Sequence, residues 1–130
     1  MPVEIGMRGE AETVVTAQDT AQAMGSGLAP VLATPRMVAL MEGAAVNAVQ
    51  SALAPGEGTV GTRLDVTHDA ATPVGMKVRA QAEVTAVEGR RITFAVSAFD
   101  GRERIGGGVH QRFIIQSERF LAKAQGKLEG

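Results

Sequence analysis

The segment Thr34–Leu53, TPRMVALMEGAAVNAVQSAL, predicts one long helix that is apolar over most of its surface. Thr34 offers a side-chain oxygen to the free N–H groups of the first turn, and Pro35 suits the first helical position. Pro55 and the glycine after it end the helix. Its few polar residues gather in one narrow stripe, formed by Arg36, Asn47, Gln50 and Ser51. Such a helix is buried, so we expect a sheet to wrap around it.

Glu42 is the exception on this helix, because it lies far from the polar stripe, on the arc of Val38 and Val49. A carboxylate among apolar groups is costly unless it is hydrogen-bonded, paired or protonated. Glu42 is therefore a candidate general base or nucleophile. Two alternatives remain open, a glutamate at a dimer contact and one that reaches water past the edge of the helix.

The other segments have the composition and alternation of strands. We expect strands at residues 8–16, 59–68, 76–87, 91–99 and 104–116. Glu88-Gly89 and Asp100-Gly101 are hairpin signals, and we expect the four strands after the helix to be joined by hairpins. The order of one strand, one helix and four strands predicts an α+β domain, in which a five-stranded antiparallel sheet is wrapped around one central helix.

The length of 130 residues predicts a single domain, residues 1–130. The segment Asp19–Ala33 contains several glycines and a proline, so we expect mostly loop with a helical turn at Ala21–Met24. It leads directly into the central helix, which makes it a lid-like loop over the N-terminus of that helix. Residues 119–130 form a C-terminal tail that is compatible with a short terminal helix.

The composition excludes several classes of function. The chain has no cysteine, which rules out disulfides, thiolate metal sites and a cysteine nucleophile. With only two histidines, it gives no indication of a metal centre. A net charge of −1 and four phenylalanines as the only aromatic residues argue against nucleic-acid binding. No segment is long and apolar enough to span a membrane, and no secretion signal is recognised, so we expect a cytoplasmic protein.

The histidines differ in their position within the strand patterns. In the strand 59–68, alternation places His68 with Leu64 and Val66 on the apolar face, and Gly61 on the other. A lone histidine there is more often a core residue, but with Glu42 as its neighbour it would form an acid–base pair. His110 is out of phase with the apolar residues of its strand, so we expect it to face outward or an interface.

Three further residues are candidates for roles in a site. Thr34 places a hydroxyl at the positive end of the helix dipole, although an N-cap role explains it equally well. Gly61 offers an unobstructed backbone N–H to an oxyanion. Arg112 is suited to bind a phosphate or carboxylate, and a solvated strand arginine is the alternative.

Three blocks of this sequence resemble the hot dog fold thioesterases, specifically the fluoroacetyl-CoA thioesterase family. They are VLATPRMVALMEGAAV at 31–46, APGEGTVGTRLDVTHDAATPVGM at 54–76 and VEGRRITFAVSAFDGRERIGGGVHQR at 87–112. The resemblance covers about residues 31–116. It implies a hot dog fold, a homodimer with two active sites at or near the subunit interface, and an acyl-CoA substrate that brings CoA itself, with no separate cofactor. Whether dimers pair into tetramers stays open.

The resemblance also implies the site. In that family a threonine, a glutamate eight positions later and a histidine 26 beyond it form the catalytic set, which corresponds here to Thr34, Glu42 and His68. Gly61 corresponds to the family's glycine seven residues before the histidine, and Arg112 to its arginine in the last strand. The family implies hydrolysis of an acyl-CoA thioester without a metal.

Two differences from that family concern the acyl pocket. The segment 19–33 is shorter than the family's lid and contains no aromatic residue, and Gly43 stands where the family has a bulky aromatic. Both differences remove bulk and favour a different or larger acyl group. Two alternatives to hydrolysis are a hot dog hydratase or dehydratase acting on enoyl or hydroxyacyl thioesters, and a non-catalytic acyl-CoA-binding protein.

Overall fold

The computed structural model describes residues 2–129, so Met1 and Gly130, the ends of the predicted domain and tail, lie outside the described residues. The elements are β1 (Arg8–Val14), η1 (Ala17–Asp19), α1 (Ala21–Met24), α2 (Thr34–Val49), η2 (Gln50–Ala52), β2 (Glu57–His68), β3 (Lys77–Glu88), β4 (Arg91–Phe99), β5 (Arg104–Gln116), α3 (Ser117–Gly126) and η3 (Lys127–Glu129). The predicted central helix is present as α2, and its predicted last turn is the 3-10 helix η2.

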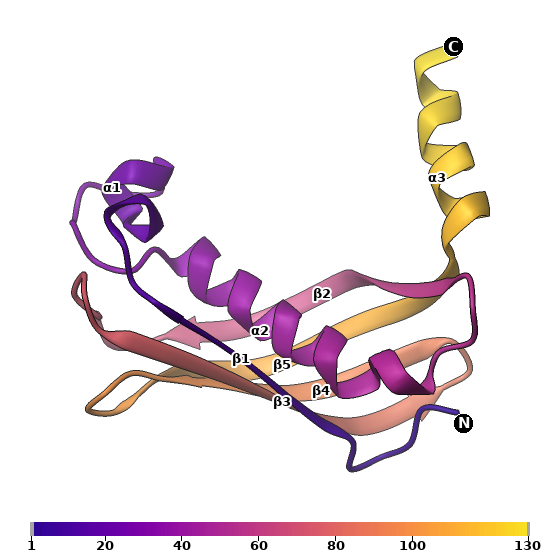
Figure 1. Cartoon of the computed structure of the whole chain (residues 1–130), viewed down its shortest axis with the longest axis horizontal. Helices are drawn as coiled ribbons and strands as arrows, with labels where there is room; N and C mark the ends of the chain where they lie inside the picture. The colour runs from indigo at the N-terminus through magenta and orange to yellow at the C-terminus, as the bar shows by residue number, and fades with distance from the viewer. Residues whose placement is uncertain (1, 130) are drawn as a thin grey trace.

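One antiparallel sheet curls around α2, with the strand order β1-β3-β4-β5-β2 (Figure 1). This confirms the predicted α+β architecture with five strands and one central helix. The prediction that hairpins join all four strands after the helix is wrong for β2, which pairs with β5, whereas β3 pairs with β1. The reason is that β1 already lies beside β3, so the place left for β2 is the free edge of β5.

The core lies between α2 and the inner face of the sheet. Alternate residues of β3 and β4 point inward, as their period of two predicts. These side chains pack on the helix face formed by Met37, Leu40, Met41, Ala44, Ala45, Ala48 and Val49. Alanine and glycine dominate one side of α2. The backbone of the sheet therefore approaches the helix closely on that side.

The closest approach of helix and sheet is at Gly9 of β1. A Cβ added to Gly9 would overlap the carbonyl oxygen of Ala44 and the backbone nitrogen of Ala48. A clash with backbone atoms cannot be relieved by rotating a side chain. Gly9 therefore sets the distance between β1 and α2.

Strand β2 contains a β-bulge that changes which residues face the helix. The pairing with β5 shifts by one between Gly61 and Arg63, so Gly61 pairs with Arg112 and Leu64 pairs with His110. Because paired residues share a face, Gly61, Leu64 and His68 all face α2. The predicted placement of Gly61 opposite His68 is wrong, since strict alternation does not account for the extra residue of the bulge.

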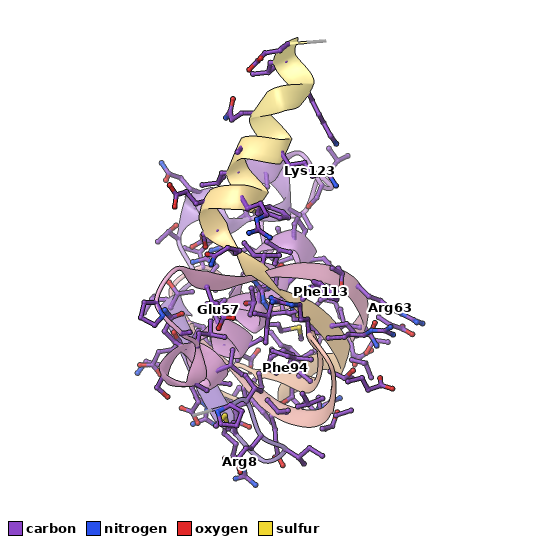
Figure 2. All side chains as sticks on the ribbon, turned by 90° about the vertical axis from the view of Figure 1, so that its right-hand side faces the viewer. Arg8, Glu57, Arg63, Phe94, Phe113 and Lys123 are labelled. Carbon is purple, nitrogen blue, oxygen red and sulfur yellow. The ribbon has the colours of Figure 1, made fainter. Side chains whose placement is uncertain are left out.

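Helix α3 continues from β5 and stands away from the sheet, with Lys123 on the projecting part (Figure 2). None of its residues is buried. The expected terminal helix is thus present. Within residues 2–129, no helix has both the length and the apolar character needed to cross a membrane.

Gly9→Ala tests the close approach of β1 and α2. The added methyl group forces β1 away from α2, and we expect the free energy of unfolding to fall by more than about 2 kcal/mol. Urea unfolding measures this change. Gly27→Ala is the control, because its Cβ would only touch Ala21 at 3.5 Å. Equal stability of the two variants would contradict the packing argument.

Candidate active site

Thr34 and His68 meet at the N-terminal end of α2. The Thr34 hydroxyl lies 2.7 Å from Nδ1 of His68, which is the last residue of β2. Thr34 is not the N-cap that the sequence suggested, because Ala33 occupies that position and makes no side-chain cap. Thr34 is already inside the helix, so its hydroxyl points sideways to the sheet and is available to the imidazole.

The other ring nitrogen of His68 is buried without a hydrogen-bond partner among the described residues. Leaving such an atom unpaired costs about 1–3 kcal/mol, so a group from outside this chain is expected to complete it. Burial lowers the pKa of His68 below its ordinary value of 6.5, although the Ala70 backbone and the Asp69 carboxylate oppose the shift. The imidazole is therefore neutral at pH 7 and able to accept a proton.

The loop between β1 and α2 lies beside this pair. A cleft is lined by Thr34 and His68 together with Ala21, Ser26, Val31, Leu32, Asp69, Ala70 and Ala71. An ion pair of 3.0 Å between Arg36 and Asp19 ties the loop to the first turn of α2. Its position agrees with a lid over the N-terminus of the helix, and closure of that lid stays a prediction.

Glu42 belongs to a second cluster, two turns further along α2. Its carboxylate lies 3.5 Å from Nη1 of Arg112, and its side chain is 41% exposed. Glu42 lines a cleft with Val38, Gly61 and Leu64. In the single chain, Glu42 therefore reaches water past the edge of the helix while it faces Arg112.

Gly61 allows the carboxylate to approach the backbone of β2. A Cβ at this position would lie 2.8 Å from Oε2 of Glu42, 3.1 Å from Cε1 of His110 and 3.4 Å from Nη1 of Arg112. Any larger residue would displace at least the carboxylate. The absence of a side chain at Gly61 thus shapes this half of the site.

Arg112 is buried, and each of its three nitrogens has a protein partner. Its Nε donates to the hydroxyl of Thr59 at 2.8 Å, and Nη2 donates to the Thr59 carbonyl at 2.9 Å. Nη1 lies 3.2 Å from Nε2 of His110. Burial lowers the pKa of Arg112 and the Glu42 carboxylate opposes that shift, so the side chain stays cationic at neutral pH. A solvated strand arginine is excluded.

His110 was not expected in this cluster, because the sequence placed it outward. That prediction is wrong, since only 1% of His110 is exposed, whereas Val109 and Phe113 are 44% and 41% exposed. The prediction assumed that the apolar residues of β5 face the core. In this part of β5, the polar residues face inward and the apolar residues face outward. Two polar residues spaced by two, His110 and Arg112, are the signal that could have indicated a functional face.

The two clusters are separate within one chain. From Thr34 to Glu42 the helix rises about 12 Å, and from Gly61 to His68 the strand extends about 23 Å. The structure joins Thr34 with His68, and Glu42 with Gly61 and Arg112, but it does not bring Glu42 to His68. Within residues 2–129, no group of three potential metal ligands is found.

Comparison with known proteins identifies relatives over most of the chain. The profile of the family described as fluoroacetyl-CoA-specific thioesterase matches residues 15–118. The fluoroacetyl-CoA thioesterase of Streptantibioticus cattleyicolor is 52% identical over 97 residues, which cover 75% of this chain and 70% of that protein.

Solved structures agree with this result. The structure of the fluoroacetyl-CoA thioesterase FlK superposes with a TM-score of 0.92 at 41% identity and covers 98% of both chains. A thioesterase superfamily member of Thermus thermophilus superposes with a TM-score of 0.90 at 30% identity, over 98% of this chain and 95% of the other. The fold of the chain is the hot dog fold.

The two neutral imidazoles make stability depend on pH. Burial lowers the pKa of His110, as it does for His68. Between these lowered values and 6.5, the unfolded chain binds more protons than the folded chain. We therefore expect the free energy of unfolding to be highest above pH 6.5 and to fall as the pH falls through this window. Urea unfolding at several pH values measures it, and NMR titration should give both histidines midpoints below 6.5. A midpoint above 6.5 for either one would contradict the burial argument.

Proposed function

The chain belongs to the fluoroacetyl-CoA-specific thioesterase family, and from this membership we propose how its residues hydrolyse an acyl-CoA thioester to the free acid and CoA. One observation carries the proposal. The two halves of the predicted catalytic set lie apart along the edge strand β2, with the Thr34–His68 pair at its C-terminal end and Glu42 beside its middle residues.

His68 handles the protons and Thr34 assists the attack. The neutral imidazole accepts the Thr34 hydroxyl proton at Nδ1, or shares it, over 2.7 Å. The unpaired Nε2 is then available to the reacting groups, and it can return a proton to the thiolate of CoA when the carbon–sulfur bond breaks. In this tautomer the Thr34 hydroxyl supports the attack. With the proton on Nδ1 instead, the ring donates to the Thr34 oxygen, and the hydroxyl hydrogen is free to bind the developing oxyanion.

Glu42 supplies the negative charge for the attack, as nucleophile or as the base that takes a proton from water. Its carboxylate is open to solvent on one side and faces Arg112 on the other. The backbone N–H of Gly61 polarises the thioester carbonyl. Arg112 orients Glu42, because Thr59 and His110 hold its guanidinium beside that carboxylate.

A second copy of the chain brings the two halves together. Strand β2 is at the edge of the sheet, and within residues 2–129 it pairs on one side only. Its middle residues are exposed, including Leu64 at 36%. An exposed edge of this length favours antiparallel pairing with an identical strand about a twofold axis. The site is then shared, and each dimer has two.

The bulge defines the register of this pairing. With the twofold axis at Asp65, Leu64 lies opposite the partner's Val66 and Gly61 lies opposite the partner's His68, all on the helix face. Gly61 and His68 are seven residues apart, but the bulge leaves one residue between them unpaired. They are therefore six ladder positions apart, three on each side of Asp65. The same register places the two Asp65 carboxylates opposite each other across the axis. Arg63, which projects outward at this edge (Figure 2), lies diagonal to the partner's Asp65 and offsets their repulsion.

The acyl group is larger than fluoroacetyl in this proposal. Apart from Asp69, the residues that line the cleft beside Thr34 and His68 are small or aliphatic. Leu28 of the loop is 90% exposed and Met24 is 45% exposed, so both are free to cover a longer acyl chain.

The cytoplasmic location and the pairing of dimers into tetramers stay predictions.

Glu42→Gln tests the function. Thiol release is measured with short, aromatic and long acyl-CoAs. We expect the wild-type protein to hydrolyse at least one class, and the variant to lose about 10²–10⁴-fold in kcat because the amide cannot act as base or nucleophile. Glu118→Gln on the exposed helix α3 should keep the wild-type rate. A Glu42→Gln rate equal to wild type would overturn the assignment, and CoA-ester binding without turnover would favour a binding protein.

Mixing two inactive variants tests the shared site. Glu42→Gln and His68→Ala homodimers are each inactive, but in a mixed dimer one site receives both substitutions and the other receives neither. After subunit exchange we expect about one quarter of the wild-type rate, because half of the dimers are mixed and each has one intact site. Sedimentation analysis checks that exchange has occurred. If the mixed dimers form and stay inactive, each site belongs to a single chain.

A further inference from the structure

We infer that His110 is a positioning residue, which holds the Arg112 guanidinium against Glu42. The inference rests on the proposed function, because it concerns how the proposed reacting carboxylate is oriented. His110 is not in the predicted set of site residues, and its ring is buried on the inner face of β5.

The protonation state of His110 follows from its hydrogen bonds. Nδ1 lies 2.8 Å from the carbonyl oxygen of Arg63, and a carbonyl only accepts, so Nδ1 carries the proton. In the neutral ring Nε2 is then an acceptor, and Nη1 of Arg112 donates to it at 3.2 Å. The ring also stacks on Phe94, with centroids 6.1 Å apart and planes at 26°. Tautomer and ring plane are both fixed.

The guanidinium of Arg112 is consequently held along two edges. Thr59 accepts from Nε through its hydroxyl and from Nη2 through its carbonyl, and His110 accepts from Nη1. Because the guanidinium is planar, these contacts define its plane. They leave one N–H of Nη1 and one of Nη2, and Nη1 is the nitrogen that faces Glu42. The hydrogen bonds also offset part of the cost of burying the charge.

Glu42 depends on this rigidity, because little else holds its carboxylate. The side chain is 41% exposed, and its ion pair with Nη1 is 3.5 Å long. A pair that is this long, and open to solvent on the Glu42 side, orients a flexible side chain only if the cation is fixed. The titratable or charged groups near the carboxylate are Arg112 and His110. A displacement of about 1 Å at a reacting group can reduce the rate about 100-fold.

A purely structural role for His110 makes different predictions. The ring fills the core beside Phe94 and links β5 to β2 through Arg63. If this were its whole contribution, substitutions would lower stability and leave kcat of the folded protein unchanged. A positioning role lowers kcat with little effect on KM, because the interaction acts on the reacting group.

Two substitutions at position 110 separate these roles. Asparagine keeps a donor near the Nδ1 position and loses the acceptor at Nε2, whereas the longer glutamine places an amide oxygen near Nε2. In thiol-release assays we expect His110→Asn to lower kcat about 10–100-fold with KM nearly unchanged, and His110→Gln to restore most of the rate. Melting temperatures confirm that both are folded. Equal kcat values for the two folded variants would overturn the inference.

Thr59 provides a second test should either variant at position 110 fail to fold. Thr59→Val removes the acceptor for Nε of Arg112, and Thr59→Ser keeps it. We expect kcat to fall for valine and to be retained for serine. The same pair is compared by NMR of the Arg112 Nε–H, whose slow solvent exchange should be lost only with valine. If valine accelerates this exchange but leaves kcat at the serine level, the rate does not depend on how the guanidinium is held, and the inference is overturned.

The NMR comparison also separates this inference from the proposed function. If the wild-type protein releases no thiol from any acyl-CoA, the proposed function fails. The Arg112 Nε–H signal then still decides whether His110 holds the guanidinium. His110→Asn should accelerate its exchange and His110→Gln should preserve it, and equal exchange in both would overturn the positioning role.

Discussion

The close contact between α2 and the curled sheet is the constraint on which the rest of the structure depends. Gly9 leaves no room between β1 and the backbone at Ala44 and Ala48, so the helix is held at one height above the strands. Two consequences follow. The start of α2 lies at the end of β2, where Thr34 reaches His68, and the third turn lies above Gly61, where Glu42 reaches the backbone.

Strand β2 links this scaffold to the proposed chemistry through its edge and its bulge. Without the bulge, Gly61 and His68 would face opposite sides of the sheet, because they are seven positions apart and side chains alternate. The extra residue puts both on the helix face. In the proposed dimer, the same residue count brings Gly61 next to the partner's His68. A local irregularity of the strand thus has a direct role in assembling the shared site.

Charge is handled differently in the two halves of the site. His68 and His110 are kept neutral by burial, one with a free nitrogen and one with both nitrogens engaged. Arg112 keeps its charge although it is buried, because Thr59 and His110 accept from it and Glu42 balances it. The buried polar groups around Arg112 therefore orient its guanidinium. Nε2 of His68 has no hydrogen-bond partner among the described residues, and a substrate or partner group is expected there.

The sequence alone was sufficient for the α+β architecture, the central helix and the inward faces of β3 and β4, because hydrophobic periodicity reports directly on burial. It also singled out Thr34, Glu42 and His68 as residue types suited to acid–base chemistry. Only the tertiary structure decided the place of β2 in the sheet, the inward position of His110 and the separation of Glu42 from His68. Strand order and facing depend on contacts between distant segments and on one bulge, and neither leaves a periodic signal in the chain. For the same reason, alternation assigned His110 to the wrong face. Its neighbour Arg112 is likewise stable inside only through partners on β2 and α2, which the folded structure brings to it.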